Sequence, residues 1–267
     1  MPAVRYPIGV RAWHLLHGVE WNMNEGEYAA LLKATDVLTP SSSKRKSRPP
    51  YTMEIMVKLH PHFDHSLPLD VSCWSCLTTL FWSTSCGGEF TVKTLKSFDP
   101  AINIARSAGT VAVDRNGLQQ TNFKLPRTKS ALHGESVYWA QQHGLSDPEA
   151  ALANHFSINN PPLDTALFTY RYKNSHHVLT KSAFTTRLSA AFKAADLDWC
   201  QIHGIRIGST LEYLLRGIPL EVMKCKGRWA SDAFSLYLRN HAKIMVPYMQ
   251  ADPQLHQNVL RIIVPRV

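Results

Sequence analysis

The sequence lacks an apolar run long enough to span a bilayer, and it shows no signal peptide. Cysteine is sparse and odd in number, and the five that occur are Cys73, Cys76, Cys86, Cys200 and Cys225. Acidic residues are also few, since 20 Asp and Glu stand against 29 Lys and Arg and give a formal net charge of +9. We therefore expect an intracellular, reduced protein without a disulfide framework or a membrane partner. The positive surplus suits a polyanionic partner.

The composition is that of a folded protein, because 45% of the 267 residues are hydrophobic and 10% are aromatic. Apolar residues at helical spacing predict two short helices within 1–40 and further helices over 53–60 and 69–83. They also predict one helix within 139–165 and one over 181–195, for which Thr180 is the N-cap. Alternation at Val111 and Val113 and an Asn116–Gly117 turn predict a hairpin within 107–138. The segment ESVYWA, residues 135–140, either adds a third strand or begins the next helix. The expected fold is mainly α-helical with a small antiparallel β-sheet.

A stretch near the carboxyl end, residues 203–240, combines the residue types that handle phosphate. His203 and Arg206 stand one helical turn apart, so their side chains share a face of the predicted helix. The residues that complete the set are Lys224, Lys226, Arg228, Trp229, Tyr237 and Arg239. An arginine fork binds two phosphate oxygens, histidine moves protons near neutral pH, and tyrosine can be a covalent nucleophile. The stretch predicts half of an active site for cutting and rejoining DNA, with no metal or nucleotide cofactor.

These motifs also carry a family resemblance. The HxxR at 203–206, the Gly-x-Trp at 227–229 and the Tyr-x-Arg at 237–239 resemble the C-terminal catalytic boxes of the tyrosine recombinase (phage integrase) family. The amino-acid sequence of residues 205–239 most resembles recombinase-like domains of fungal mobile elements. The resemblance implies a type IB topoisomerase-like reaction on double-stranded DNA, in which Tyr237 forms a 3′-phosphotyrosine. It implies that His203, Arg206 and Trp229 hold the phosphate, and that the fold is the recombinase catalytic core.

One box departs from the family pattern. The segment STSCGGEFTV, residues 83–92, resembles the first box, in which an arginine is followed by x-Gly-Glu. Cys86 stands at the arginine position, and Glu89 stands where the family holds an orienting acidic residue. A thiol offers no permanent charge and no fork of donors, so the loss amounts to about 1000-fold in rate. We expect an impaired or inactive enzyme unless another cation substitutes, with Arg106 and Lys93 as candidates.

The sequence TKS at 128–130 resembles the hairpin element whose lysine protonates the leaving 5′ oxygen. The resemblance therefore implies that Lys129 is the general acid, with Lys124 in reserve. Taken without the family, position alone favours an exposed hairpin lysine at Lys129.

Other cations are expected to contact the DNA backbone, where phosphate contacts dominate affinity. The predicted DNA-binding residues are Lys44, Arg45, Lys46, Arg48, Lys181, Arg187, Lys224, Lys226, Arg228 and Arg239. The first four form a basic linker over 40–52, which also resembles a nuclear import signal. This linker would join a remnant of the helical core-binding domain (1–39) to the catalytic domain (53–245), followed by a tail (246–267) that docks in cis or on a second copy.

Several features have plainer interpretations. The group His60, His62, Asp64 and His65 has no common metal-site spacing and is interpreted as a surface loop, and Cys73–Cys76 as core packing. His176 and His177 are placed in a solvated loop. Each residue of the 203–240 set also has a structural alternative, such as Arg206 pairing with Glu212 or Glu221. Three hypotheses follow: a mobile-element recombinase, a non-catalytic DNA-binding remnant of one, or a basic helical regulator.

Overall fold

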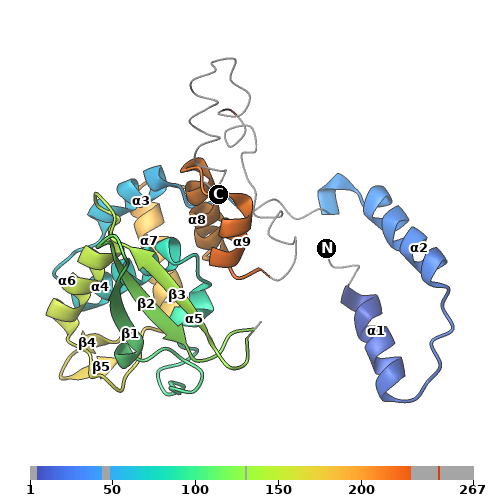
Figure 1. Cartoon of the computed structure of the whole chain (residues 1–267), viewed down its shortest axis with the longest axis horizontal. Coiled ribbons are helices and arrows are strands. Elements are labelled where there is room, and N and C mark those ends of the chain that lie inside the picture. Colours follow the sequence, from blue (N-terminus) through green and yellow to red (C-terminus); the bar gives the residue numbers. More distant parts are fainter. Residues whose placement is uncertain (1–4, 44–48, 130, 230–245, 247–267) are drawn as a thin grey trace. The chain divides into compact units, whose positions relative to one another are not determined.

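The computed structural model describes residues 5–43, 49–129, 131–229 and 246, and the chain divides into two compact units, Met1–Ser47 and Arg48–Val267 (Figure 1). The boundary falls inside the predicted linker. Tyr237, Arg239 and the linker cations 44–48 lie outside the described residues. None of the helices in the described part of the chain has the length and apolar character of a membrane span.

The first unit consists of α1 (Arg5–Leu16), α2 (Glu25–Leu38) and the short 3-10 helix η1 (Ser41–Ser43). The two helices agree with the prediction for 1–40. The α2 helix begins after Asn24, whose side chain accepts hydrogen bonds from the backbone N–H groups of Gly26 and Glu27.

The second unit holds the remaining elements. In chain order they are α3 (Met53–Leu59), η2 (His60–His62), α4 (Pro68–Trp82), α5 (Gly87–Phe90), η3 (Arg106–Ala108), β1 (Gly109–Val113), β2 (Gln119–Leu125), β3 (Glu135–Ala140), α6 (Pro148–Asn159), β4 (Tyr170–Tyr172), β5 (Ser175–His177), α7 (Lys181–Ala194), α8 (His203–Leu215) and α9 (Leu220–Lys226). The mainly α fold with a small antiparallel sheet is therefore confirmed.

The centre of this unit is α4, which is buried over its whole length from Asp70 to Trp82 and contacts α6, α7 and α8 (Figure 1). Cys73 and Cys76 are fully buried among them, which confirms their interpretation as core packing. Asp70 is a charged residue among the buried residues of α4. Arg187 on α7 neutralises it with two hydrogen bonds of 2.5 and 2.6 Å.

The sheet has the strand order β1-β2-β3 and is antiparallel throughout, with Val111 opposite Thr121 and Thr121 opposite Trp139. Its inner face buries Phe123 against Trp139, with ring centroids 4.6 Å apart. The alternative left open for residues 135–140 is thus decided in favour of a strand.

The second hairpin, β4-β5, was not predicted, and the placement of His176 and His177 in a loop is wrong because both lie on β5. The strands have only three residues each, too few for a clear alternation. The ring of His177 stacks on Tyr172 with centroids 4.5 Å apart, a pairing across the hairpin that single-strand patterns do not reveal.

His155 on α6 makes folding stability depend on pH. Its side chain is completely buried, with Nε2 3.0 Å from the Leu167 carbonyl oxygen and Nδ1 3.0 Å from the Asn159 side-chain nitrogen. Burial lowers the pKa of His155 to about 4, against 6.5 for an exposed histidine. Between pH 6.5 and pH 4, His155 is therefore protonated in the unfolded chain but neutral in the folded chain.

We expect the free energy of unfolding to fall by about 3 kcal/mol between pH 6.5 and pH 4 because of this residue. Urea unfolding at a series of pH values checks this, with His155→Gln as the comparison. An equal dependence on pH in both proteins would show that His155 is not responsible.

Candidate phosphate-binding site

The site is built on the first two turns of α8, which are fixed against the segment that precedes α3. The Gly204 carbonyl oxygen accepts a hydrogen bond of 3.0 Å from Tyr51 N–H. Gly208 lies directly against the Tyr51 backbone, where a Cβ would come within 2.6 Å of the Tyr51 carbonyl carbon. On the α4 side, the hydroxyls of Ser209 and Thr84 are 2.8 Å apart. Helix α8 is thereby held at a fixed height and rotation.

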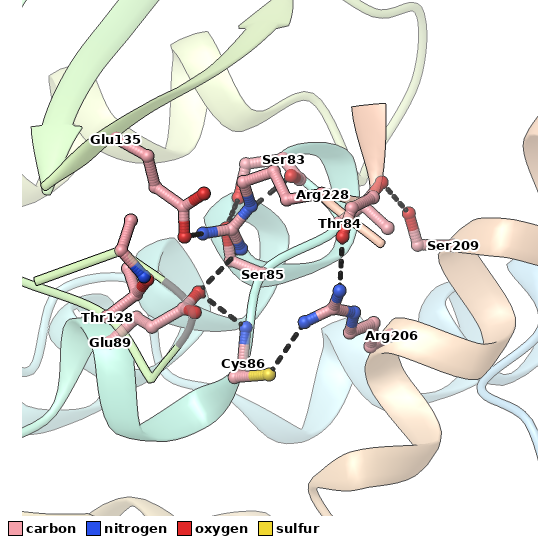
Figure 2. A network of polar contacts seen from close by, with 12 residues as sticks. Ser83, Thr84, Ser85, Cys86, Glu89, Thr128, Glu135, Arg206, Ser209 and Arg228 are labelled. Atoms are coloured by element: carbon pink, nitrogen blue, oxygen red, sulfur yellow. Dashed lines mark hydrogen bonds and ion pairs between the residues drawn. The ribbon is translucent and has the colours of Figure 1, made fainter. Parts of the chain in front are cut away.

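Arg206 occupies the centre of the site, and only 8% of its surface is exposed. Its Nη1 donates to the Cys86 sulfur at 2.9 Å, and its Nη2 donates to the Gly227 carbonyl oxygen (Figure 2). The guanidinium carbon lies 4.6 Å from the ring centroid of Trp229. Arg206 therefore contacts Cys86 and Trp229, and not the carboxylates of Glu212 or Glu221 that the structural alternative proposed. Glu212 pairs with Arg216 instead.

Cys86 lies at the N-terminus of α5 and is partly exposed. Its backbone N–H donates to Glu89 Oε2 at 2.8 Å in a capping box, so the same carboxylate that follows Cys86 in the sequence fixes its backbone. Position 86 and Arg206 are 120 residues apart in the chain, yet they meet in the site. The two segments that the sequence analysis linked only by motif order are thus neighbours in space.

Arg228 is next to Arg206 but has a different environment. Its Nη2 is 2.8 Å from Glu89 Oε2 and its Nη1 is 2.9 Å from Glu135 Oε1, with 9% of the side chain exposed (Figure 2). Burial alone would lower the pKa of Arg228, but the hydrogen bond to Glu89 and the charges of Glu89 and Glu135 raise it above the usual value. Its charge is already compensated by two carboxylates, which fits a structural role better than the DNA contact that we predicted.

Two other predicted DNA cations are likewise engaged inside the protein. The Lys226 ammonium is 4.5 and 4.8 Å from the ring centroids of Tyr138 and Tyr213 and donates to the Tyr138 carbonyl oxygen at 3.0 Å. Burial lowers the pKa of Lys226 to about 8. Arg187 is bound to Asp70, and its guanidinium lies 4.4 Å from the centroid of Phe63. These contacts join helices and sheet.

The remaining candidates lie on the surface or at element ends. Lys129 is exposed in the connection between β2 and β3, and its neighbour Thr128 belongs to the polar network around Glu89 in Figure 2. His203 is the first residue of α8 and is partly buried, and Lys224 is partly buried on α9. Lys181 is exposed at the start of α7, after the N-cap Thr180.

Sequence reasoning missed Glu135, Gly227 and the ion pairs of Arg228. Glu135 gives no local signal because a carboxylate at the start of a strand is ordinary, and its partner is 93 residues away. Of the candidate substitutes for the missing arginine, Arg106 is 4.7 Å from the Phe156 ring centroid and donates to Asn160, and Lys93 is exposed.

Among the described residues, no group of three or more His, Cys, Asp or Glu side chains could hold a metal ion. Two of the four residues considered earlier for such a site, His60 and His65, stack on each other with ring centroids 4.2 Å apart. Both rings also contact Trp74 of α4.

No protein-family model and no curated protein sequence matches the chain. Similar solved structures include the complex described as "FLP Recombinase-Holliday Junction Complex I" (TM-score 0.48, 12% identity, covering 92% of this chain and 60% of that one). Another is XerH site-specific recombinase bound to palindromic difH substrate in a post-cleavage complex (TM-score 0.49, 13% identity, 82% and 54%). A third is the "Flpe-Holliday Junction Complex" (TM-score 0.46, 13% identity, 88% and 62%).

The chain therefore spans 54–62% of the length of these solved chains. The likeness is distant and concerns the backbone.

Proposed function

We propose that this chain binds double-stranded DNA and cuts and rejoins one strand slowly, through a 3′-phosphotyrosine at Tyr237. The observation that carries the proposal is the meeting of Arg206 with Cys86, since 2.9 Å separates two residues from motifs 120 positions apart. Motifs that matched by chance would have no reason to converge on one guanidinium. The ring of Trp229, from the Gly-x-Trp motif, lies beside the same guanidinium, so a third motif also meets at Arg206.

The proposed reaction uses the residues as follows. The Tyr237 oxygen bonds to the scissile phosphorus, and the bond from phosphorus to the 5′ oxygen breaks. Lys129 gives its ammonium proton to the leaving 5′ oxygen, and His203 takes the tyrosine hydroxyl proton. Arg206 stabilises the negative charge that develops on the non-bridging oxygens, and Trp229 orients the Arg206 guanidinium. Rejoining is the same exchange in reverse, with the 5′ hydroxyl as nucleophile.

Cys86 is the reason to expect a slow reaction. Where the resemblance places a second guanidinium, the structure holds a thiol that itself accepts a hydrogen bond from Arg206. The thiol has no permanent charge to offer a phosphate oxygen, and losing such a contact costs about 1000-fold in rate.

A non-catalytic DNA-binding remnant of a recombinase is the second candidate. It is favoured by the ion pairs of Arg228, because Glu89 and Glu135 place two negative charges beside one positive charge at the edge of the site. Both candidates share the partner, double-stranded DNA. Integration of a mobile element in the nucleus, by a homo-oligomer on the DNA, is the setting that we propose for the active form.

Trapping of a covalent adduct on nicked suicide duplexes separates the candidates. We expect slow formation of an adduct that Tyr237→Phe abolishes, and duplex binding that weakens steeply with added KCl. Arg206→Met should weaken binding and prevent the adduct. Arg216→Met is the matched control, since Arg216 is 43% exposed and pairs with Glu212 away from the site.

The other outcomes also decide between the hypotheses. Salt-dependent binding without any adduct identifies the remnant. Absence of duplex binding by the unmodified chain excludes both candidates.

A further inference from the structure

The turn that ends α9 carries an arginine at a position that usually holds glycine. Arg228 N–H bonds to the Cys225 carbonyl at 3.0 Å and Trp229 N–H bonds to the Lys224 carbonyl at 3.1 Å, which is the Schellman arrangement. Arg228 is the left-handed residue of this turn, with φ of 59°. A side chain in that conformation costs about 1 kcal/mol, which glycine avoids. A compensating interaction of the Arg228 side chain is therefore expected.

The interaction is the pair of carboxylates described above. Glu89 belongs to α5 and Glu135 to β3, so the Arg228 guanidinium joins the end of α9 to both elements (Figure 2). Glu89 Oε2 also accepts the backbone N–H of Cys86. One carboxylate oxygen thus fixes Cys86 and Arg228 relative to each other.

The two chain neighbours of Arg228 both contact Arg206. Gly227 supplies the carbonyl oxygen that accepts from Arg206 Nη2, and the Trp229 ring lies against the guanidinium. Gly227 and Trp229 are packed so closely that a Cβ on residue 227 would overlap the indole. The position of the turn therefore determines the orientation of Arg206.

We propose that Arg228 is a positioning residue of the phosphate site: it holds Gly227, Trp229 and Cys86 around Arg206 and does not itself touch DNA. This deepens the proposed function and rests on it. Binding of a phosphate by Arg228 would require breaking two ion pairs that are largely shielded from water.

A double-mutant cycle on duplex affinity tests the proposal. If Arg228 acts through Arg206, Arg228→Met weakens binding in the unmodified chain but adds no further loss in the Arg206→Met background. The slope of log K against log salt also stays the same for Arg228→Met. Adduct formation should fall by about 100-fold, because a small misplacement of a catalytic group is enough for such a loss. Arg228→Lys, which keeps the charge but not the fork, should restore part of it.

A direct phosphate contact predicts the opposite: additive losses and a salt slope reduced by about one. That result would overturn the positioning role while leaving the proposed function intact. If Arg206→Met has no effect on duplex affinity, the proposed function is the one that fails.

A spectroscopic measurement tests positioning without DNA. The ring current of Trp229 should shift the side-chain proton resonances of Arg206, and this shift should be lost in Arg228→Met and kept in Arg216→Met. An unchanged shift in folded Arg228→Met would refute the positioning role. If Arg228→Met does not fold by circular dichroism, Glu135→Gln replaces it, because it removes one of the two carboxylate charges and leaves Glu89 in place; a smaller loss of the same shift is then expected.

Discussion

Replacing Cys86 with arginine should raise the rate of covalent adduct formation on nicked duplexes by about 1000-fold, the usual effect of one cation at a reacting phosphate. The side chain at position 86 is partly exposed, so an arginine can extend from it toward solvent without displacing the core. Its backbone is fixed by Glu89, which gives the new guanidinium a defined starting point. Arg206, released from the sulfur, then becomes available to a second phosphate oxygen.

Cys225→Arg is the matched control for added charge. Cys225 is exposed on α9 and lies outside the site, so its replacement raises the net charge equally and should change only non-specific affinity. The gain must also vanish when Cys86→Arg is combined with Tyr237→Phe. If Cys86→Arg forms adduct no faster than the unmodified chain, position 86 does not limit the reaction.

Gly208→Ala should destabilise the second unit by about 4 kcal/mol, in the range reserved for severe steric conflict. The added methyl carbon would lie 2.6 Å from the Tyr51 carbonyl carbon and 2.8 Å from its nitrogen, and closer still to the carbonyl oxygen. These are backbone atoms of a fully buried residue, so they cannot rotate away as a flexible side chain would. Relief requires α8 to move, and Arg206 moves with it.

Urea unfolding measures this loss, with Gly88→Ala as the control. A Cβ on Gly88 would meet nothing within 4 Å, and its helix is exposed at that position, so the control should be neutral within about 1 kcal/mol. A midpoint for Gly208→Ala close to that of Gly88→Ala would mean that the contact between α8 and Tyr51 is loose.

The helices were predictable because their signals are local. Thr180 caps α7 as expected, and the apolar spacing after His203 places α8 correctly. Helix α4 agrees with the predicted range 69–83 to within one residue at each end. The strands β4 and β5 were not predicted because three residues are too few to show an alternation of apolar and polar side chains.

The partners of charged side chains were not predictable in the same way. Arg187 and Arg228 were interpreted as DNA contacts from their charge and position, yet Asp70 and Glu135 neutralise them from segments 117 and 93 residues away. Cys86 was placed in the site by motif order alone. A cation can face either a ligand or a carboxylate of the protein, and the packing of distant segments decides between them. Residue spacing in the sequence does not reveal this packing.

The convergence of Arg206 with a segment 120 residues earlier has a consequence for biosynthesis. Contacts of such sequence separation form late, because a long loop must close before they yield any stabilisation. A nascent chain that has emerged only as far as the sheet contains Cys86 and Glu89 but not yet Arg206 and Arg228, their partners in the folded protein. On the function proposed above, an incomplete chain cannot cut DNA, because Arg206 and Arg228 are translated after the sheet.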